Sequence, residues 1–375
     1  MLKTLNMKNL HLPLTDIILN SLNDGLYVCD RARRIVYWSK SAERLTGWTA
    51  EEVVGHRCLD NILIHEDKDG HRLCGEEFCP LHRCMVTNTA STCPVIVFGQ
   101  TKTGGRVPML VSVSPIHDQE GQVVGGVESF HDFSETYQDL ERAKQIQMLS
   151  LECDLPQDDR LNFASFYLPH DMIGGDYYAI CKLDANCYGF LLADVMGYGV
   201  AAALHTMHLS SLWGRYRESL FDPTEFASQV NRELSKIVKG ESFATAVCGL
   251  IDAATRTVRF VSAGGPPLVL LNRDGDARQL NAPGLPFGMF ADADYDETEF
   301  TYAPGDCLLM FTDGAIEIHN AYGQQLKTEG LINILKSLGY PQSNIEMEPL
   351  QKALLRFSND IRLEDDLTFL DVRFF

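Results

Sequence analysis

The sequence predicts an α+β protein in which two globular parts, both built on antiparallel sheets, are joined by a helix. The chain has 375 residues, enough for about two or three domains. In both parts, short strand-like runs follow one another across tight turns, which is typical of antiparallel sheets. Between them, residues 134–156 carry apolar side chains at helical spacing. We therefore predict domains at 14–133 and 157–375, with a linker helix at 134–156.

The first part begins with two β-type runs, "GLYVCD" and "RIVYWS", separated by the hairpin-like connection "RARR". The segment "KSAERLTGW" follows with helical spacing of its apolar residues. Three more strand-like runs then come in succession across turn-rich separators: "CPVIVFGQT", "RVPMLVSVSPIHD" and "VVGGVESFHDF". This order predicts a five-stranded antiparallel sheet with small helices between its second and third strands.

Such an arrangement resembles a PAS sensor domain. The resemblance covers residues 14–133 and is carried by "LNDGLYVCDRARRIVYWSKSAERLTGWTAEEVVGHRC" and by the closing run "GGVESFHDFSE". PAS domains bind many different ligands or none, so the resemblance implies a sensory role without naming the signal.

A Cys- and His-rich segment, "CLDNILIHEDKDGHRLCGEEFCPLHRC", lies inside this first part. It lacks the tight C-x2-C spacing of most zinc sites and the C-x-x-C-H spacing of covalent haem. Two interpretations stay open: a sensor site that holds zinc or an iron–sulfur centre, and a reduced-thiol surface or redox-reactive loop. The candidate residues are Cys58, His65, Cys74, Cys79 and Cys84.

The linker "SETYQDLERAKQIQMLSLECDLP" has an apolar stripe at helical spacing and is closed by Pro156. It is either a connector packed on its own chain or a dimerising signalling helix. We favour the second interpretation, because an apolar stripe on an exposed linker requires a partner. We therefore expect a homodimer through this helix.

The composition of the chain limits the kinds of partner it can bind and the cellular compartment we expect for it. The formal net charge of -19 argues against non-specific binding to nucleic acid or to an anionic membrane, since both are polyanions. No run reaches the roughly 18–20 apolar residues that span a bilayer, and the N-terminus lacks the pattern of a signal peptide. Eleven cysteines without an export signal indicate a reducing, cytoplasmic setting.

The second part, residues 157–375, contains Asp residues at the ends of predicted strands. The runs "YYAICKL" and "CYGFLLADV" flank the turn "DAN". A hairpin centred on Ala185 places Asp176 opposite Asp194, with Cβ atoms about 5 Å apart. Two carboxylates this close repel each other unless they share a proton or bind a cation.

A second pair of Asp residues lies far away in the sequence. The strand "GDCLLMFTDG" ends at Asp313, and the strand "EDDLTFLDVRFF" begins at Asp365–Asp366. If these strands are antiparallel neighbours, Asp313 approaches Asp365 and four carboxylates converge. Hard oxygen ligands favour Mg²⁺ or Mn²⁺, and two such ions suit phosphoester hydrolysis by an activated water that attacks phosphorus in line.

The string "IGGDYY" is also similar to the signature of diguanylate cyclases. A cyclase needs this signature deep within its domain, after a metal-binding Asp and a nucleotide-binding helix. Here it follows the linker almost at once, and "TDG" and "DDLTF" would have no role. We therefore do not favour the cyclase.

Taken together, residues 149–375 resemble the metal-dependent (PPM-type) Ser/Thr protein phosphatases of the SpoIIE/RsbU family. The matching segments occur in family order: "IGGDYY", "LLADVMGYGVAAAL", "FATAVCGLIDAATRTVRFVSAGGPPLVLL", "GLPFGMF", "PGDCLLMFTDGAIEIHNAYG" and "EDDLTFLDVRF". The resemblance implies two stacked antiparallel sheets flanked by helices. It also implies a serine phosphatase, controlled by the PAS domain, whose substrate is a phosphoserine on a regulatory partner such as a STAS-type anti-sigma factor antagonist.

The resemblance also implies roles for individual residues toward two or more Mn²⁺ or Mg²⁺ ions. Asp194 would bridge two ions, with the backbone carbonyl of Val195 on one of them. Asp176 would bind one ion, while Asp313 and Asp365 would bind the other. No side chain would act as a catalytic nucleophile, because the metal-activated water attacks.

Three residues depart from the family pattern. Ala193 stands where Gly is frequent, and Tyr198 and Gly265 stand where His is frequent. None of these changes removes a carboxylate, so we expect an active enzyme. The alternative is a catalytically weak sensor or scaffold with a phosphatase fold.

Overall fold

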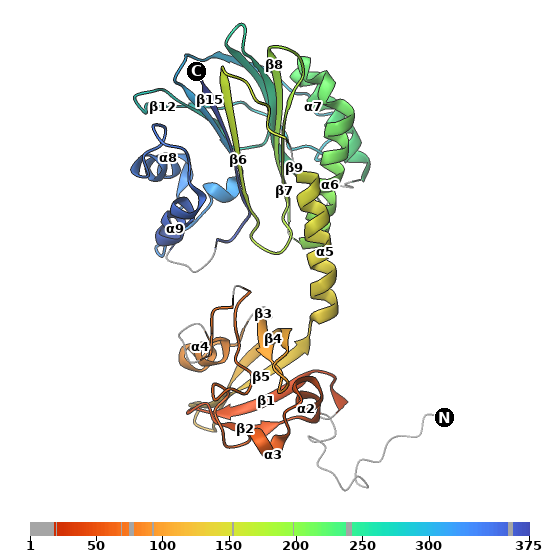
Figure 1. Cartoon of the computed structure of the whole chain (residues 1–375), viewed down its shortest axis with the longest axis vertical. Helices are drawn as coiled ribbons and strands as arrows, with labels where there is room; N and C mark the ends of the chain where they lie inside the picture. The colour runs from red at the N-terminus through yellow and green to blue at the C-terminus, as the bar shows by residue number, and fades with distance from the viewer. Residues whose placement is uncertain are drawn as a thin grey trace, which may run out of the picture. The chain divides into compact units, whose positions relative to one another are not determined.

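The computed structural model describes residues 19, 21–68, 70–74, 79–91, 94–151, 154–197, 199–237, 242–358 and 363–375. Their contacts divide the chain into two compact units, with the division between Asp139 and Leu140. Helix α5, Ser134–Leu151, runs across this division (Figure 1). Each unit is described by itself below.

The N-terminal unit is built on one five-stranded antiparallel sheet with the strand order β2-β1-β5-β4-β3. The predicted PAS-like sheet is confirmed, and the predicted runs match the observed strands closely. Small helices follow the second strand, as predicted. The elements are β1 Gly25–Asp30, β2 Ile35–Trp38, α2 Lys40–Thr46, α3 Ala50–Val53, α4 Pro80–Thr87, β3 Val95–Gln100, β4 Arg106–His117 and β5 Val123–Asp132.

Strand β5 lies at the centre of this sheet, and α4 covers one of its faces. A Cβ atom added to Gly126 would lie 2.7 Å from a methyl carbon of Leu81, so α4 packs directly on the strand. Glu128 of β5 lies opposite Tyr27 of β1 and Val113 of β4. A charged residue therefore occupies the middle of a buried sheet face.

The C-terminal unit contains two five-stranded antiparallel sheets with the orders β13-β10-β9-β8-β7 and β12-β11-β14-β15-β6. The strands are β6 Leu161–Leu168, β7 Asp176–Lys182, β8 Cys187–Val195, β9 Ala244–Asp252, β10 Thr257–Ala263, β11 Leu268–Leu271, β12 Ala277–Leu280, β13 Thr298–Thr301, β14 Cys307–Phe311 and β15 Leu367–Phe374. The helical elements are α6 Gly199–Tyr216, η2 Arg217–Phe221, α7 Pro223–Ile237, η3 Asp313–Ala315, α8 Lys327–Ser337 and α9 Met347–Ser358.

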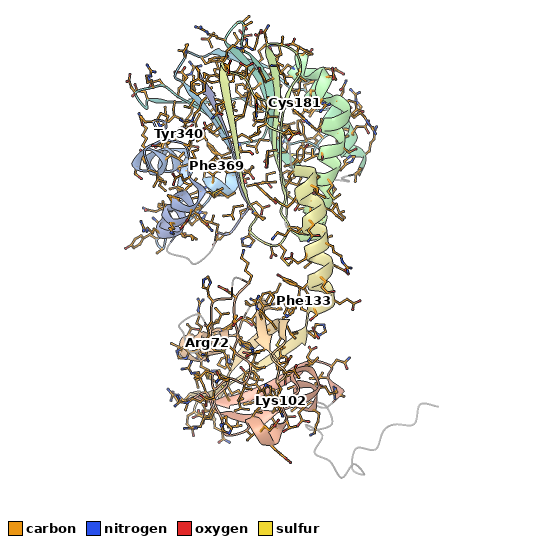
Figure 2. The ribbon with its side chains drawn as sticks, in the orientation of Figure 1. Arg72, Lys102, Phe133, Cys181, Tyr340 and Phe369 are labelled. Carbon is orange, nitrogen blue, oxygen red and sulfur yellow. The ribbon has the colours of Figure 1, made fainter. Side chains whose placement is uncertain are left out.

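These two sheets stack face to face and are flanked by helices, as predicted (Figure 1). Phe190 of β8 and Leu370 of β15 belong to the apolar layer between the sheets. Helices α6 and α7 cover the outer face of one sheet, and α8 and α9 cover the outer face of the other. Phe369 of β15 and Tyr340 belong to the apolar cluster between this second sheet and its helices (Figure 2). Strands β8 and β15 are covered on both faces, which explains their almost continuous apolar runs.

The predicted linker helix is present but shorter than expected. It begins at Ser134, directly after β5 and Phe133, and ends at Leu151 instead of continuing to Pro156 (Figures 1 and 2). The domain boundaries at 14–133, 134–156 and 157–375 stay predictions, and residues 14–18 lie outside the described part of the chain. Within that part, no helix combines the length and the apolar character needed to cross a membrane.

Replacing Phe190 by Ala should destabilise the C-terminal unit by about 3–5 kcal/mol, because the ring is fully buried between the sheets. Phe290→Ala is the matched control, since Phe290 is 57% exposed. Guanidinium unfolding of the full chain, with peptide-resolved hydrogen exchange to separate the two units, measures the effect. Equal stability losses in the two variants would contradict the stacking described above.

Candidate metal centre

The first pair of carboxylates is set by a hairpin register. Strands β7 and β8 pair antiparallel, and Asp176 lies directly opposite Asp194. This register confirms the prediction made from the turn at Ala185. It follows from the short connection between the strands, because a turn of this kind fixes the pairing of every residue beyond it.

A second pair comes from the other sheet. Strands β14 and β15 pair antiparallel, which meets the condition on which the sequence argument for this pair depended. Asp313 opens η3 directly after β14, and Asp365 lies two residues before β15. A Cβ atom added to Gly314 would lie 3.2 Å from the Cβ of Asp365 and 2.0 Å from a backbone oxygen, so only glycine fits in this turn.

The four carboxylates are close enough to influence one another's charge. Burial raises the pKa of Asp194, and the neighbouring Asp176, Asp313 and Asp365 raise it further. Burial also raises the pKa of Asp176. The pKa of Asp313 is raised by burial and by the charge of Asp365. Without a cation, some of these carboxylates hold protons, because several buried negative charges this close together repel one another. When a cation is bound, the same carboxylates ionise and bind the cation.

Asp176 itself provides the best indication of a cation. Its Oδ2 atom accepts hydrogen bonds from the hydroxyls of Thr312 and Thr368. Its Oδ1 atom is buried and has no hydrogen-bond partner among the described residues. Such an oxygen costs about 1–3 kcal/mol unless something binds it. The all-oxygen donor set fits Mg²⁺ or Mn²⁺.

Asp366, next to the predicted ligand Asp365, has a different role. Its carboxylate accepts the backbone N–H of His170, at 2.6 Å, and that of Gly175. It therefore fixes the loop that leads into Asp176. The sequence alone did not reveal this role, because the loop and Asp366 are almost 200 residues apart.

Val195 ends β8, and its backbone carbonyl lies close to the same loop. A Cβ atom added to Gly175 would lie 2.8 Å from the Val195 oxygen. Gly197 and Gly199 have φ angles of 101° and 75°, which favour glycine. Tyr198 lies outside the described residues.

In the described part of the chain, no group of three or more His, Cys, Asp or Glu side chains is arranged to hold a metal ion. Ion binding at the carboxylates therefore requires side-chain rotation. An open pocket of about 460 Å³ lies beside Asp365 and Gly314. Glu317 and the exposed His319 line it as well.

Helix α5 contacts this centre through Gln147, which sequence reasoning missed. The Gln147 side chain is 2% exposed. Its Nε2 donates to the carbonyl of Gly174 at 2.6 Å and to the Thr206 hydroxyl at 3.0 Å. Its Oε1 accepts the N–H of Gly174 at 3.2 Å. One amide thus satisfies both backbone groups of a residue two positions before Asp176.

The Cys/His candidates of the N-terminal unit also gather in one place. All five side chains are buried, so they do not form a thiol surface, while the metal site and the redox-reactive loop both stay open. Burial raises the pKa of each thiol, which disfavours the thiolate in the absence of a cation. These residues are Cys58, His65, Cys74, Cys79 and Cys84.

Comparison with known proteins decides the family. The profile described as Stage II sporulation protein E (SpoIIE) matches residues 184–375, just over half of the chain. The chain belongs to the SpoIIE family. A second profile, described as PAS fold, matches residues 19–138, so this SpoIIE-family protein carries an N-terminal PAS domain.

Two relatives come from Bacillus subtilis (strain 168). Phosphoserine phosphatase RsbP is 30% identical over 186 residues, which are 48% of this chain and 46% of that protein. The match therefore spans about half of RsbP. Phosphoserine phosphatase RsbU is 24% identical over 304 residues, which are 81% of this chain and 88% of that protein.

Two solved structures share the fold of the C-terminal unit. The SiaA-PP2C domain of Pseudomonas aeruginosa superposes with a TM-score of 0.55 at 21% identity, covering 64% of this chain and 97% of that one. The PP2C phosphatase domain of Bacillus subtilis SpoIIE, with a fragment of its regulatory domain, gives a TM-score of 0.51 at 18% identity, covering 76% and 80%. The stacked sheets thus have the PP2C-type fold.

Gln147→Ala should lower the free energy of unfolding of the C-terminal unit by about 1–3 kcal/mol, since it leaves two buried backbone groups of Gly174 unpaired. Gln145→Ala on the exposed side of the same helix is the control. Hydrogen exchange at residues 170–176 provides a local measurement. If the amides of residues 170–176 exchange at the same rate in Gln147→Ala as in the wild type, Gln147 does not hold this loop in place.

Proposed function

We propose that this protein is a divalent-metal-dependent protein serine phosphatase whose PAS domain controls its activity. One observation carries the proposal: Asp176 has a buried, unpartnered Oδ1 atom in a cluster with Asp194, Asp313 and Asp365. Mn²⁺ or Mg²⁺ bound there supplies an activated water and neutralises phosphoryl charge. The names of RsbP and RsbU as phosphoserine phosphatases support the reaction class.

The chain's own residues would position the ions. Thr312 and Thr368 hold one oxygen of Asp176, which leaves the other oxygen directed at a ligand. Asp194 would bridge two ions, with the Val195 carbonyl on one of them. Asp313 and Asp365 would bind the second ion. No side chain is needed as a covalent nucleophile.

The proposed substrate is a phosphoserine on a regulatory protein, such as a STAS-type anti-sigma factor antagonist. The open pocket beside Asp365 supports a protein substrate, because a phosphorylated loop reaches an edge site more easily than a deep cavity. The Glu317 side chain in this pocket adds negative charge, which disfavours acidic residues beside the phosphoserine.

Asp194→Asn should reduce Mn²⁺-dependent hydrolysis of a phosphoserine protein by more than about 100-fold, since changes one shell further from a metal already cost about 10–100-fold. Asp274→Asn, an exposed Asp in a turn, is the matched control. Calorimetry with Mn²⁺ should show a parallel loss of binding in Asp194→Asn alone. Wild-type turnover in Asp194→Asn would sink the catalytic proposal and favour the alternative, a weak sensor or scaffold.

Control by the PAS domain would pass through α5. The helix begins at the end of β5 and its Gln147 holds the loop before Asp176, so a rotation of α5 would move a metal-binding residue. Exposed apolar side chains on the same helix, Ile146 and Leu149, support a homodimer through α5.

Inserting residues between Asp139 and Leu140 tests this control. Two residues rotate the helix by about 200°, whereas seven residues make nearly two full turns and preserve its phase. We expect the two-residue insertion to change phosphatase activity and the dimer fraction, and the seven-residue insertion to retain both. Activity and sedimentation of the full chain provide the readouts. Equal behaviour of the two insertions would exclude a signal carried by helix phase.

A further inference from the structure

The core of the PAS domain contains a carboxylate without a partner. Glu128 is fully buried, and neither of its carboxyl oxygens has a hydrogen-bond partner among the described residues. Burial raises the pKa of Glu128 to about 8, and Tyr27 opposite it offsets the effect only in part. Its neighbours on the two adjacent strands are Tyr27 and Val113, and neither carries a positive charge that would pair with a carboxylate.

The buried ring of His65 lies beside this carboxylate. His65 is 2% exposed, and its Nε2 atom also has no hydrogen-bond partner in the described part of the chain. Burial lowers the pKa of His65 to about 4, so the ring is neutral and retains a lone pair. Nε2 lies 3.6 Å from Oε1 of Glu128.

That separation is too long for a hydrogen bond but suits two ligands of one ion. Zinc binds His nitrogen and carboxylate oxygen at about 2.0–2.2 Å, which puts two ligands of a tetrahedral ion about 3.4 Å apart. Two buried polar atoms that do not bond to each other thus already have the spacing of neighbouring metal ligands.

Three thiols lie beside these two groups. The pKa of Cys58 is raised by burial and then by Cys74, Glu128 and Cys79, so these groups lie close together. The backbone N–H of His65 donates to the sulfur of Cys74 at 3.1 Å. Contacts of this kind stabilise a thiolate.

Cys79 occupies the N-cap position of α4. Burial raises its pKa, whereas the backbone N–H groups of His82 and Leu81 lower it. Two thiols of the cluster thus lie near backbone N–H groups that favour their charged form. A cation in the centre would reverse the cost of burial for all of these donors at once.

We propose that Glu128 and His65, together with the thiols of Cys74 and Cys79, form a mononuclear, four-coordinate site for a thiophilic divalent cation in the PAS core, with Cys58 beside it. The mixed nitrogen, oxygen and sulfur donors favour Zn²⁺ over Mg²⁺ or Ca²⁺. The donors do not yet surround a common point, so ligation closes them onto the ion by side-chain rotation. This site is separate from the carboxylates of the phosphatase domain and does not rest on the proposed function.

Cobalt is the first probe, because it reports which ligands hold it. The full-length protein, purified without air and stripped of metal, is titrated with Co²⁺. Thiolate ligands give an intense near-ultraviolet charge-transfer absorption, whereas the all-oxygen centre at Asp194 gives none. We expect this absorption with a stoichiometry of one ion per chain, and Zn²⁺ should displace it.

Variants assign the signal to residues. Cys79→Ser and Cys74→Ser should lower the charge-transfer absorption and the bound zinc, whereas Cys307→Ser should leave both unchanged. Cys307 is a matched control, since it is 4% exposed and lies in the other unit. Glu128→Gln should weaken zinc binding by about 10-fold or more while preserving shape.

Glu128→Gln also keeps the test decisive if the Cys variants fail to fold. Without a metal, removing an unpaired buried carboxylate should leave the PAS domain equally stable or more stable. With the metal, the zinc-dependent rise in its melting temperature should shrink. The proposal is overturned if the wild type gives no thiolate band with Co²⁺ and no zinc-dependent stabilisation. It is also overturned if the protein instead contains iron and acid-labile sulfide in equal amounts, which would indicate an iron–sulfur cluster.

Discussion

The hydroxyls of Thr312 and Thr368 hold the carboxylate of Asp176, and the arrangement of the catalytic edge depends on this contact. Asp176 belongs to the sheet of β7 and β8, whereas Thr368 belongs to β15 of the other sheet and Thr312 follows the end of its neighbour β14. The two hydrogen bonds therefore join the sheets where all four candidate ligands lie. They also use one carboxylate oxygen, which leaves the other available to a cation.

Several carboxylates are buried in this protein, and they differ in how their oxygens are hydrogen-bonded. Asp366 is satisfied by backbone N–H groups, so it serves as a structural clamp on the loop before Asp176. Within the described part of the chain, Asp176 and Glu128 each retain buried oxygens without a hydrogen-bond partner. Because an unpaired buried carboxylate is costly, these two are the positions at which we propose a ligand. One lies in the phosphatase domain and the other in the PAS domain.

Helix α5 follows the PAS sheet in the chain and is hydrogen-bonded to the loop before Asp176. Its first residue follows the central strand of the PAS sheet by two positions, and Gln147 near its end bonds both backbone groups of Gly174. Gly174 lies two positions before Asp176, so these hydrogen bonds are the contact through which we propose that the helix affects the metal site. The same helix exposes Ile146 and Leu149. One face of the helix therefore contacts the loop before Asp176, and another presents apolar side chains at the surface.

Local patterns in the sequence determined the elements and the first carboxylate pair. The strands of the PAS sheet and the hairpin that sets Asp176 opposite Asp194 followed from turn residues and strand periodicity, because short connections limit the possible registers. The pairing of β14 with β15 entered the sequence argument only as a condition, because a long segment that contains α8 and α9 separates the strands, and the structure decided it. The segments that resemble the SpoIIE/RsbU family are each contiguous in the sequence, so they could be recognised without knowledge of the fold. Only the tertiary structure decided the roles of Asp366, Gln147 and Glu128. Each depends on where a side chain points relative to a segment far away in the chain, and packing between distant elements sets that direction.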